Sequence, residues 1–250
     1  MNFFEHIVTL ISYIKQPAKR KLIKLSALFN QQNGLEIGGP SKLFNFKMAF
    51  PIYLYAQNID GVNFSNTTLW EGDIQQGNQY HYYKNKQGFQ FIADAIDLSM
   101  INDASYDFVL SCHSLEHVAN PIKALKEWSR VMKSHGRLVL VLPNKEFTFD
   151  HKRTVTSLAH LIKDYNNQTE ETDKTHFDEV IELHDLTMDD FVASKEELAK
   201  RTQLNIENRA VHHHVFNLEL IKQMLEYCEF EMVHQQTYPP FHLVSVAQKK

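Results

Sequence analysis

Residues 91–143, with the sequence FIADAIDLSMINDASYDFVLSCHSLEHVANPIKALKEWSRVMKSHGRLVLVLP, decide the fold of this chain. They contain three apolar runs of strand length, and a segment with helical periodicity separates the last two. Such an alternation predicts βαβ units and a parallel sheet, in which ligands bind at the carboxyl ends of the strands. Polar side chains follow the first two runs: Asp94 after one, and the segment from His113 to His117 after the other. We therefore expect a ligand site at this edge of the sheet.

The rest of the chain adds strands and helices in an order typical of an α/β domain. Asn120 predicts the N-cap of a helix with Pro121 at its first position, and a last helix is expected from Asn217 through Tyr227. The polar stretch after the fifth strand has helical pieces near residues 155–165 and 195–201. Strands are expected at residues 34–41, 57–64, 89–93, 106–112 and 136–143, with an antiparallel hairpin of residues 230–238 and 241–248 at the end.

With 250 residues, 43% of them hydrophobic, the chain is long enough for one α/β domain with a full core. We divide it into an N-terminal helical segment, residues 1–32, and a main domain, residues 33–248, with an insertion or lid at about 144–214. The net charge of −4 argues against nucleic acid as the partner. Cys112 and Cys228 form no close pair, which indicates a reducing, cytoplasmic location. Nothing here predicts an oligomeric state.

The N-terminal segment has an apolar part, Ile7 to Ile14, followed by five basic residues between Lys15 and Lys24. This order is the reverse of a secretory signal, and the apolar run is too short to span a bilayer. An amphipathic helix, broken near Pro17, is expected. We expect it to pack over the main domain, and peripheral membrane contact through residues 1–30 is the alternative.

The segment of the first strand ends in a glycine turn, in the sequence EIGGPS of residues 36–41. Gly38 and Gly39 allow the backbone to approach a ligand closely, and Glu36 suits an ammonium group or a water molecule. A dinucleotide-binding turn needs a third glycine that opens a helix. Pro40 and Ser41 follow instead, so the sequence disfavours a pyrophosphate site.

Two groups at the strand ends have chemistry suited to a bound cofactor. Asp94 can accept a hydrogen bond from an exocyclic amine such as that of adenine; the alternative is an exposed carboxylate without a ligand. His113 and His117 follow the fourth strand, where the reactive group of a cofactor would point. A histidine at this place can act as a general base near neutral pH, or it can be held in structural hydrogen bonds.

Taken in order, these motifs resemble class I S-adenosylmethionine-dependent methyltransferases. More narrowly, the chain is similar to bacterial methyltransferase-domain proteins that accompany glycosyltransferases of surface-glycan pathways. Those proteins share a turn like EIGGPS and histidine-rich segments like FDHKR, residues 149–153, and HHHVF, residues 212–216. The resemblance covers residues 33–248. It implies a Rossmann-like, mostly parallel seven-stranded sheet with a C-terminal antiparallel hairpin and a helical insertion after the fifth strand.

The resemblance also implies S-adenosylmethionine as cofactor and a small-molecule or glycan acceptor. The residues expected around the methionine part are Glu36, Gly38 and Gly39; those around the adenine are Asp94 and Ala95; those below the sulfonium are Ser111 to His113; and Asp60, with Asn63 beside it, is the candidate for the ribose. Transfer to a hydroxyl needs a base for its proton. We expect His117 or His151 to be that catalytic base.

Seven of the fourteen histidines lie between Pro143 and Val215. On an extended segment His212 and His214 would point the same way, and with His184, Asp185 or His176 they could hold Zn²⁺ or Fe²⁺. The alternatives are substrate contacts without metal, or a hydrogen-bonded lid. Three functions follow: a methyltransferase that O-methylates a glycan or glycan precursor, an inactive binding protein with the same fold, and a metal-dependent enzyme that uses these histidines.

Overall fold

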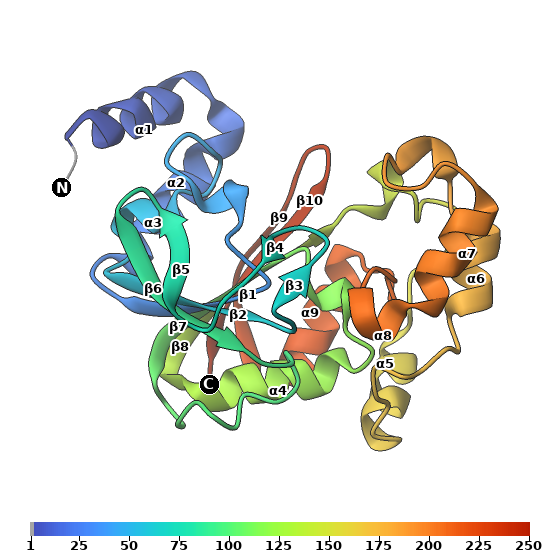
Figure 1. The fold of residues 1–250 in the computed structure, drawn as a ribbon. Coiled ribbons are helices and arrows are strands. Elements are labelled where there is room, and N and C mark those ends of the chain that lie inside the picture. The colour runs from blue at the N-terminus through green and yellow to red at the C-terminus, as the bar shows by residue number, and fades with distance from the viewer. Residues whose placement is uncertain (1–2) are drawn as a thin grey trace.

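A mixed sheet of eight strands lies between two layers of helices in the computed structural model, which describes residues 3–250 (Figure 1). The strand order is β5-β6-β2-β1-β7-β8-β10-β9, and the four pairings among β6, β2, β1, β7 and β8 are parallel. The strands are β1 (Asn33–Ile37), β2 (Asn58–Asn63), β5 (Gly77–Tyr83), β6 (Lys86–Ile92), β7 (Tyr106–Cys112), β8 (Met132–Pro143), β9 (Phe230–Tyr238) and β10 (His242–Lys249). A separate small hairpin joins β3 (Thr67–Thr68) to β4 (Gly72–Asp73).

The sheet has one strand more than the seven expected, because β5 pairs antiparallel with β6 and forms the edge of the sheet. Its sequence is largely polar, and three tyrosines supply its buried side chains, Tyr80, Tyr82 and Tyr83. Tyrosine covers a half-buried sheet surface well, although it carries a polar tip. The α/β class, the parallel centre and the C-terminal hairpin agree with the sequence expectation.

The helices fall into three groups (Figure 1). Near the N-terminus are α1 (Phe3–Lys15), α2 (Arg20–Ser26) and α3 (Ile52–Tyr55); along the main domain are α4 (Pro121–Val131) and α9 (Leu218–Tyr227); in the insertion are α5 (Leu158–Asn166), α6 (Phe177–Leu183), α7 (Lys195–Gln203) and α8 (Asn205–Asn208). Within residues 3–250, none of these helices combines the length and hydrophobicity needed to cross a bilayer.

Helices α4 and α9 begin as their sequences predict. The side chain of Asn120 accepts a hydrogen bond from the backbone N–H of Lys123, with Pro121 at the first helical position. Asn217 caps α9 in the same way, through the N–H of Leu220. Both helices pack their apolar faces on one side of the sheet.

The long strand β8 shows why the sheet is covered on both faces. Leu138, Leu140 and Leu142 pack in the core that contains α4 and α9, whereas Val139 and Val141 pack in the core that contains α2 and α3. Each fully buried side chain of this size stabilises the fold by about 1.5–3 kcal/mol relative to exposure. The continuous apolar run is therefore explained by burial on alternating faces.

The N-terminal segment packs only in part. On α2, Leu22 and Leu25 are buried in the core. On α1 the buried side chains among residues 4–15 are polar, Glu5 and Thr9, and five large apolar ones are exposed, Phe4, Ile7, Leu10, Ile11 and Ile14. The expectation that this segment packs over the main domain is thus right for α2 and wrong for the apolar face of α1.

Candidate active site

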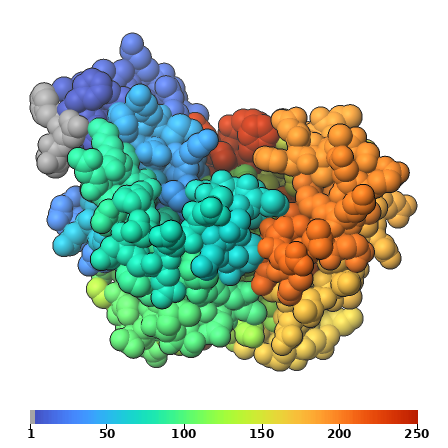
Figure 2. All heavy atoms as spheres, viewed as in Figure 1, coloured from blue at the N-terminus to red at the C-terminus, as the bar shows by residue number. Residues whose placement is uncertain are grey.

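A cavity of about 860 Å³ opens at the carboxyl ends of β1, β2, β6 and β7. One wall is the glycine turn after β1, and the loop after β7 forms the floor. Figure 2 shows the β3–β4 hairpin, in cyan, facing the orange part of the insertion, and side chains from both segments line the cavity. The volume lies in the range of small-molecule and cofactor sites.

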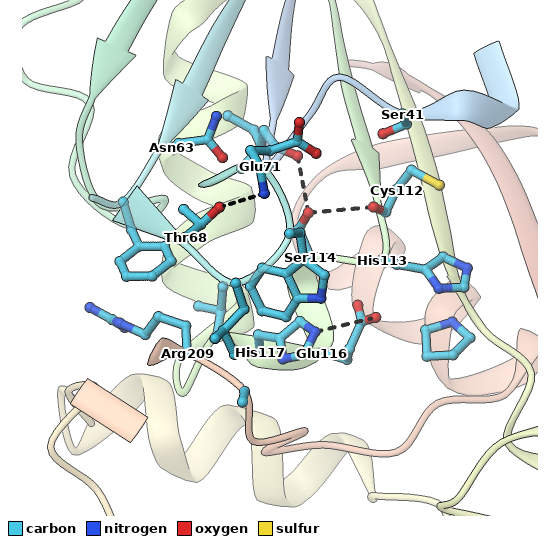
Figure 3. A pocket seen from close by; sticks show the side chains of 18 of the residues that line it. Ser41, Asn63, Thr68, Glu71, Cys112, His113, Ser114, Glu116, His117 and Arg209 are labelled. Carbon is cyan, nitrogen blue, oxygen red and sulfur yellow. Dashed lines mark hydrogen bonds and ion pairs between the residues drawn. The ribbon is translucent and has the colours of Figure 1, made fainter. Parts of the chain in front are cut away.

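Gly38 lines this cavity, and its backbone explains the need for glycine. Its φ is +74°, and an added Cβ would lie 2.2 Å from the Oγ of Ser114. Ser114 in turn donates a hydrogen bond to the carbonyl of Ile37 at 3.1 Å (Figure 3). The turn after β1 and the loop after β7 are therefore in direct contact, which leaves no room for a side chain at residue 38.

Glu36 holds the turn rather than facing the cavity. It is completely buried, and its carboxylate accepts hydrogen bonds from the hydroxyls of Tyr53 at 2.6 Å and Tyr80 at 2.7 Å, and from the N–H of Ser41 at 3.0 Å. Burial raises the pKa of this carboxyl, although the three hydrogen bonds oppose the shift. Glu36 does not line the cavity, so this geometry does not allow the expected direct contact with a ligand ammonium. Gly39 does not line the cavity either, because Tyr80 and Glu36 cover it.

Asp94 and Ala95 line the far end of the cavity, as expected, but Asp94 is already paired. Its Oδ1 accepts from the N–H of Ile96 at 3.1 Å, and its Oδ2 accepts from the guanidinium of Arg209 at 2.7 Å. Arg209 comes from the insertion and also lies 2.5 Å from a carboxylate oxygen of Glu171. The insertion thus contacts the carboxylate that was expected to bind adenine.

The expectation for Asp60 is wrong. Strand β2 continues to Asn63, so Asp60 lies inside the strand and away from the cavity. Its carboxylate accepts hydrogen bonds from the N–H of Phe89 at 2.8 Å and from the hydroxyl of Tyr106 at 2.7 Å. Asn63, at the strand end, does line the cavity.

The β3–β4 hairpin adds an acid that sequence reasoning missed. Glu71 lines the cavity near Asn63, and its N–H donates to the hydroxyl of Thr68 at 3.0 Å (Figure 3). Burial raises the pKa of its carboxyl. The short hairpin gives no strong periodicity, so its sequence did not indicate that a side chain returns to the strand ends.

Of the residues expected at the floor, His113 lines the cavity and Ser111 does not. Ser111 is fully buried within β7 and does not line the cavity. His113 does, with its Nε2 3.0 Å from Nδ1 of His242. Burial lowers the pKa of His113 to about 3, and the neighbouring imidazoles of His242 and His212 act in the same direction. His113 is therefore neutral at physiological pH.

His117 lines the cavity as expected, and it is part of a larger group with Glu116 and His212. One ligand atom from each of the three lies within 4.8 Å of the others. Nδ1 of His117 is 3.2 Å from the carbonyl of Val211, which can only accept, so its proton is on Nδ1 and Nε2 has a free lone pair. Glu116 and His117 point toward one another in Figure 3, and neither oxygen of the Glu116 carboxylate has a hydrogen-bond partner among the described residues.

His212 is fixed by Asp150. Its Nδ1 donates to the Asp150 carboxylate, so that Nε2 is its free nitrogen. Burial alone would lower the pKa of His212, but the carboxylates of Asp150 and then Glu116 raise it. The resulting pKa of His212 lies above the ordinary imidazole value. Burial keeps the pKa of His117 well below its ordinary value. The same burial raises the pKa of Glu116 to about 7.

The expectation that His151 faces the same cavity is wrong. Its Nε2 lies 2.8 Å from the carboxylate of Asp185, its side chain is partly exposed, and it does not line the cavity. Its neighbour Asp150 turns inward instead, because the buried guanidinium of Arg153 donates to Asp150 at 3.0 Å and to the carbonyl of His212 at 2.8 Å.

His212 and His214 also do not share a ligand site. The ring of His212 packs against His117 at 4.6 Å between centroids, whereas that of His214 packs against His176 at 5.2 Å. Residues 209–217 form no regular strand, so the alternation assumed for an extended segment does not hold. His184 belongs to neither group, because its Nε2 lies 3.1 Å from Asp189.

Comparisons with known proteins agree with this arrangement. Residues 48–140 match the family model of a methyltransferase domain. The comparison with curated proteins gave no significant match. Three similar solved structures cover nearly all of this chain. The first is an S-adenosylmethionine-dependent methyltransferase from Mesorhizobium loti, with 10% identity, a TM-score of 0.53, and 93% of this chain and 96% of that chain covered. The second is a candidate S-adenosylmethionine-dependent methyltransferase from Listeria monocytogenes, with 15% identity, a TM-score of 0.51, and 94% of this chain and 100% of that chain covered. The third is 1,6-didemethyltoxoflavin-N1-methyltransferase from Burkholderia thailandensis with bound 1,6-didemethyltoxoflavin and S-adenosylhomocysteine, with 12% identity, a TM-score of 0.50, and 94% of this chain and 77% of that chain covered.

The family match and the fold bear out the expected enzyme class, an S-adenosylmethionine-dependent methyltransferase, and its cofactor. At these identities the solved structures support the fold alone. The acceptor of this chain has to be argued from its own residues.

Proposed function

We propose that this chain transfers the methyl group of S-adenosylmethionine to a hydroxyl oxygen of a glycan or glycan precursor, with His212 as the base. The observation that carries the proposal is the buried pair of Asp150 and His212, of which His212 lines the same cavity as the glycine turn. The hydroxyl oxygen attacks the methyl carbon, the bond from methyl carbon to sulfur breaks, and the hydroxyl proton passes to Nε2 of His212. Neutral S-adenosylhomocysteine leaves.

Several groups are placed to hold the cofactor. Gly38 lets its methionine part approach the turn, and we propose Asp94 and Ala95 for the adenine, since both line the cavity. In place of Asp60 we propose Asn63 and Glu71 for the ribose hydroxyls, since both line the cavity near the end of β2. Glu36 acts through the turn that it holds.

The properties of His212 suit a base. Asp150 raises the pKa of His212 above the ordinary imidazole value. The imidazole is therefore basic enough to bind the proton of an acceptor hydroxyl near neutral pH. Asp150 also keeps the proton of the neutral imidazole on Nδ1, which leaves the lone pair on Nε2. His117, whose pKa burial keeps low, is suited to accept a hydrogen bond from the same hydroxyl.

The rim of the cavity supports a sugar as acceptor. Trp70 from the hairpin is 51% exposed and Phe191 from the insertion is 79% exposed, although both line the cavity. Large aromatic faces open to solvent at a cavity mouth are suited to the C–H faces of a sugar ring, whose hydroxyls stay hydrated at the edge. This agrees with the sequence resemblance to proteins of surface-glycan pathways.

The exposed apolar face of α1 supports a membrane-associated acceptor. Its large side chains, Phe4, Ile7, Leu10, Ile11 and Ile14, are all exposed, and the basic residues Lys15, Lys19, Arg20, Lys21 and Lys24 follow directly. A helix with an apolar face beside a basic cluster binds anionic lipid surfaces. We propose peripheral membrane contact through this segment, from the cytoplasmic side, where Cys112 and Cys228 stay reduced as the free thiols seen here.

A metal-assisted form of the reaction is a second candidate, favoured by Glu116. A buried carboxylate without a hydrogen-bond partner is costly, and it lies between two imidazoles whose tautomers are fixed by Val211 and Asp150. A divalent cation held by Glu116, His117 and His212 would bind an acceptor hydroxyl and lower its pKa. In this form His212 is a ligand and not the base.

The function is tested with radiolabelled S-adenosylmethionine, purified protein and lipid-linked or free oligosaccharides from bacterial cells. We expect label in a saccharide fraction, stable to mild base as an ether is, and no label with His212→Gln. Cofactor binding by calorimetry separates the alternatives. Binding without transfer to any saccharide would overturn the acceptor proposal, and a protein that binds neither S-adenosylmethionine nor S-adenosylhomocysteine would be an inactive member of the fold.

A further inference from the structure

A second group of histidines lies in the insertion, outside the cavity. His160 is on α5, His176 precedes α6, and His214 is in the segment before α9, and one ligand atom from each lies within 4.8 Å of the others. The carboxylate of Asp164, one turn after His160 on α5, lies beside them. None of these four residues lines the cavity, so the group is separate from the site described above.

The distances around His160 are those of a coordination shell. Nε2 of His160 is 3.1 Å from Nε2 of His176 and 3.3 Å from Oδ2 of Asp164, and one ring nitrogen of His214 lies within 4.8 Å of a ring nitrogen of each of the other two histidines. Ligands of a tetrahedral Zn²⁺ lie at about 2.0–2.1 Å from the ion, which places neighbouring ligand atoms roughly 3.3 Å apart. Imidazole nitrogens and carboxylate oxygens are both ligands of this ion in proteins.

Hydrogen bonding leaves the group incomplete without a cation. Nδ1 of His214 and Oδ2 of Asp164 are buried, and neither has a hydrogen-bond partner among the described residues. Nε2 of His214 lies 3.2 Å from the carbonyl of Ala119, which can only accept, so the lone pair of this imidazole is on the unpartnered Nδ1. Native structures leave few buried polar groups unsatisfied, and each one requires an explanation.

The insertion has a small hydrophobic cluster of its own, while Leu161 on α5 packs in the main core. Its own hydrophobic cluster consists of three side chains, Phe177, Val180 and Val211. A core this small stabilises a chain segment weakly, and metal ions commonly replace the missing core in small elements. The four candidate ligands come from three parts of the insertion that are distant in sequence.

We propose that His160, Asp164, His176 and His214 bind one structural Zn²⁺, which joins α5, the start of α6 and the segment before α9. Because His214 is two residues after His212, the ion fixes the backbone that presents His212 to the cavity. The site has four protein ligands and no open position, which is the arrangement of structural and not of catalytic zinc. This inference does not depend on the proposed methyl transfer.

The test is metal analysis by mass spectrometry of protein purified without a histidine tag, together with thermal unfolding. We expect one zinc per chain and a lower melting temperature after removal of zinc by a chelator, restored by Zn²⁺. The double variant His160→Asn/His176→Asn is expected to lose this zinc. His81→Asn, an exposed histidine on β5, is the matched control and is expected to keep it.

Two further measurements keep the result unambiguous. Glu116→Gln disrupts the cavity group and is expected to leave the structural zinc in place; zinc lost from this variant and kept in the double variant would overturn the assignment. X-ray absorption at the zinc edge of the wild-type protein requires no variant to fold, and a shell of three imidazoles and one oxygen is expected. A wild-type protein that binds no zinc after incubation and gel filtration would overturn the proposal.

Discussion

His212 donates a hydrogen bond from Nδ1 to the carboxylate of Asp150, a residue 62 positions earlier in the chain, and His212 lines the cavity. Asp150 is held in turn by the buried guanidinium of Arg153. The insertion therefore does more than cover the cavity. It supplies an imidazole whose tautomer, orientation and basicity are set by buried partners.

This pair predicts the pH dependence of methyl transfer. The neutral form of His212 is the base, so kcat/KM rises with pH as His212 loses its proton, and the inflection lies above the ordinary imidazole value of 6.5 because Asp150 raises the pKa. In Asp150→Asn the raising charge is gone, and the inflection moves to lower pH. His212→Gln is expected to lower kcat by about 10²–10⁴ with cofactor affinity unchanged. A profile with the same inflection in wild type and Asp150→Asn would contradict the role of the pair.

Gly38 offers a test of the turn with a matched control elsewhere in the chain. Gly38→Ala combines a positive φ with a Cβ only 2.2 Å from Ser114, whereas Gly72→Ala has a similar φ of +69° and open space around it. Positive φ alone costs about 1–3 kcal/mol for a residue with a side chain. We expect urea denaturation to show a larger loss for Gly38→Ala than for Gly72→Ala, and cofactor binding to be weakened in Gly38→Ala only. Equal losses would mean that contact with Ser114 is unimportant.

Much of the fold follows from local sequence because the central strands are buried on both faces. The apolar run of β8 predicts a buried strand, and the capping residue before α4 predicts the start of a helix. The structure contains both elements. The edge strand β5 was missed because its burial depends on three tyrosines within a polar segment, and on a partner strand that its own sequence does not reveal.

The site was predictable only where it lies directly at strand ends. Gly38, Asp94 and His117 follow strands, and they line the cavity. His212 and Arg209 reach it through the fold of the insertion, which depends on long-range contacts that no local pattern encodes.

Two errors at the site came from a small difference in position along the chain. Asp60 was chosen as the acid nearest to the end of the second strand, but it lies three residues before that end, which is at Asn63. His151 was chosen where its neighbour Asp150 points inward, because adjacent residues in a loop face different directions.

The ion pair between Arg209 and Asp94 predicts competition with the cofactor. If Asp94 accepts a hydrogen bond from the adenine amine, that amine competes with the Arg209 guanidinium at Oδ2 and with the N–H of Ile96 at Oδ1. A hydrogen bond to a charged group contributes about 1.5–3 kcal/mol, so Asp94→Ala should weaken S-adenosylmethionine binding roughly 10- to 100-fold. Arg209→Ala should strengthen it. Calorimetric titration checks both, with Asp97→Ala, outside the cavity, as control.

The exposed face of α1 predicts lipid binding that depends on both its parts. The double variant Leu10→Glu/Ile14→Glu removes apolar surface without touching the buried Glu5 and Thr9, and it should abolish co-sedimentation with anionic vesicles. Wild type should bind vesicles that contain phosphatidylglycerol and lose binding as salt rises, since the basic cluster acts through screened charge. Equal sedimentation of wild type and double variant would end the proposal of membrane contact.

Glu116 separates the two forms of the reaction. With His212 as the base, a chelator leaves the initial rate unchanged as long as the structural zinc of the insertion stays bound. Glu116→Gln then has a small effect on kcat, because a neutral amide replaces a carboxyl whose pKa of about 7 already leaves it partly protonated. With a cation held by Glu116, His117 and His212, the chelator abolishes transfer, and Mg²⁺, Mn²⁺ or Zn²⁺ restores it. Glu116→Gln then lowers kcat, because the activation free energy rises by the several kcal/mol that Lewis-acid stabilisation supplies. Activity measured against added metal in wild type and Glu116→Gln decides between them: a metal requirement that Glu116→Gln removes or weakens assigns the cation to this group. Activity without metal in both proteins leaves His212 as the base.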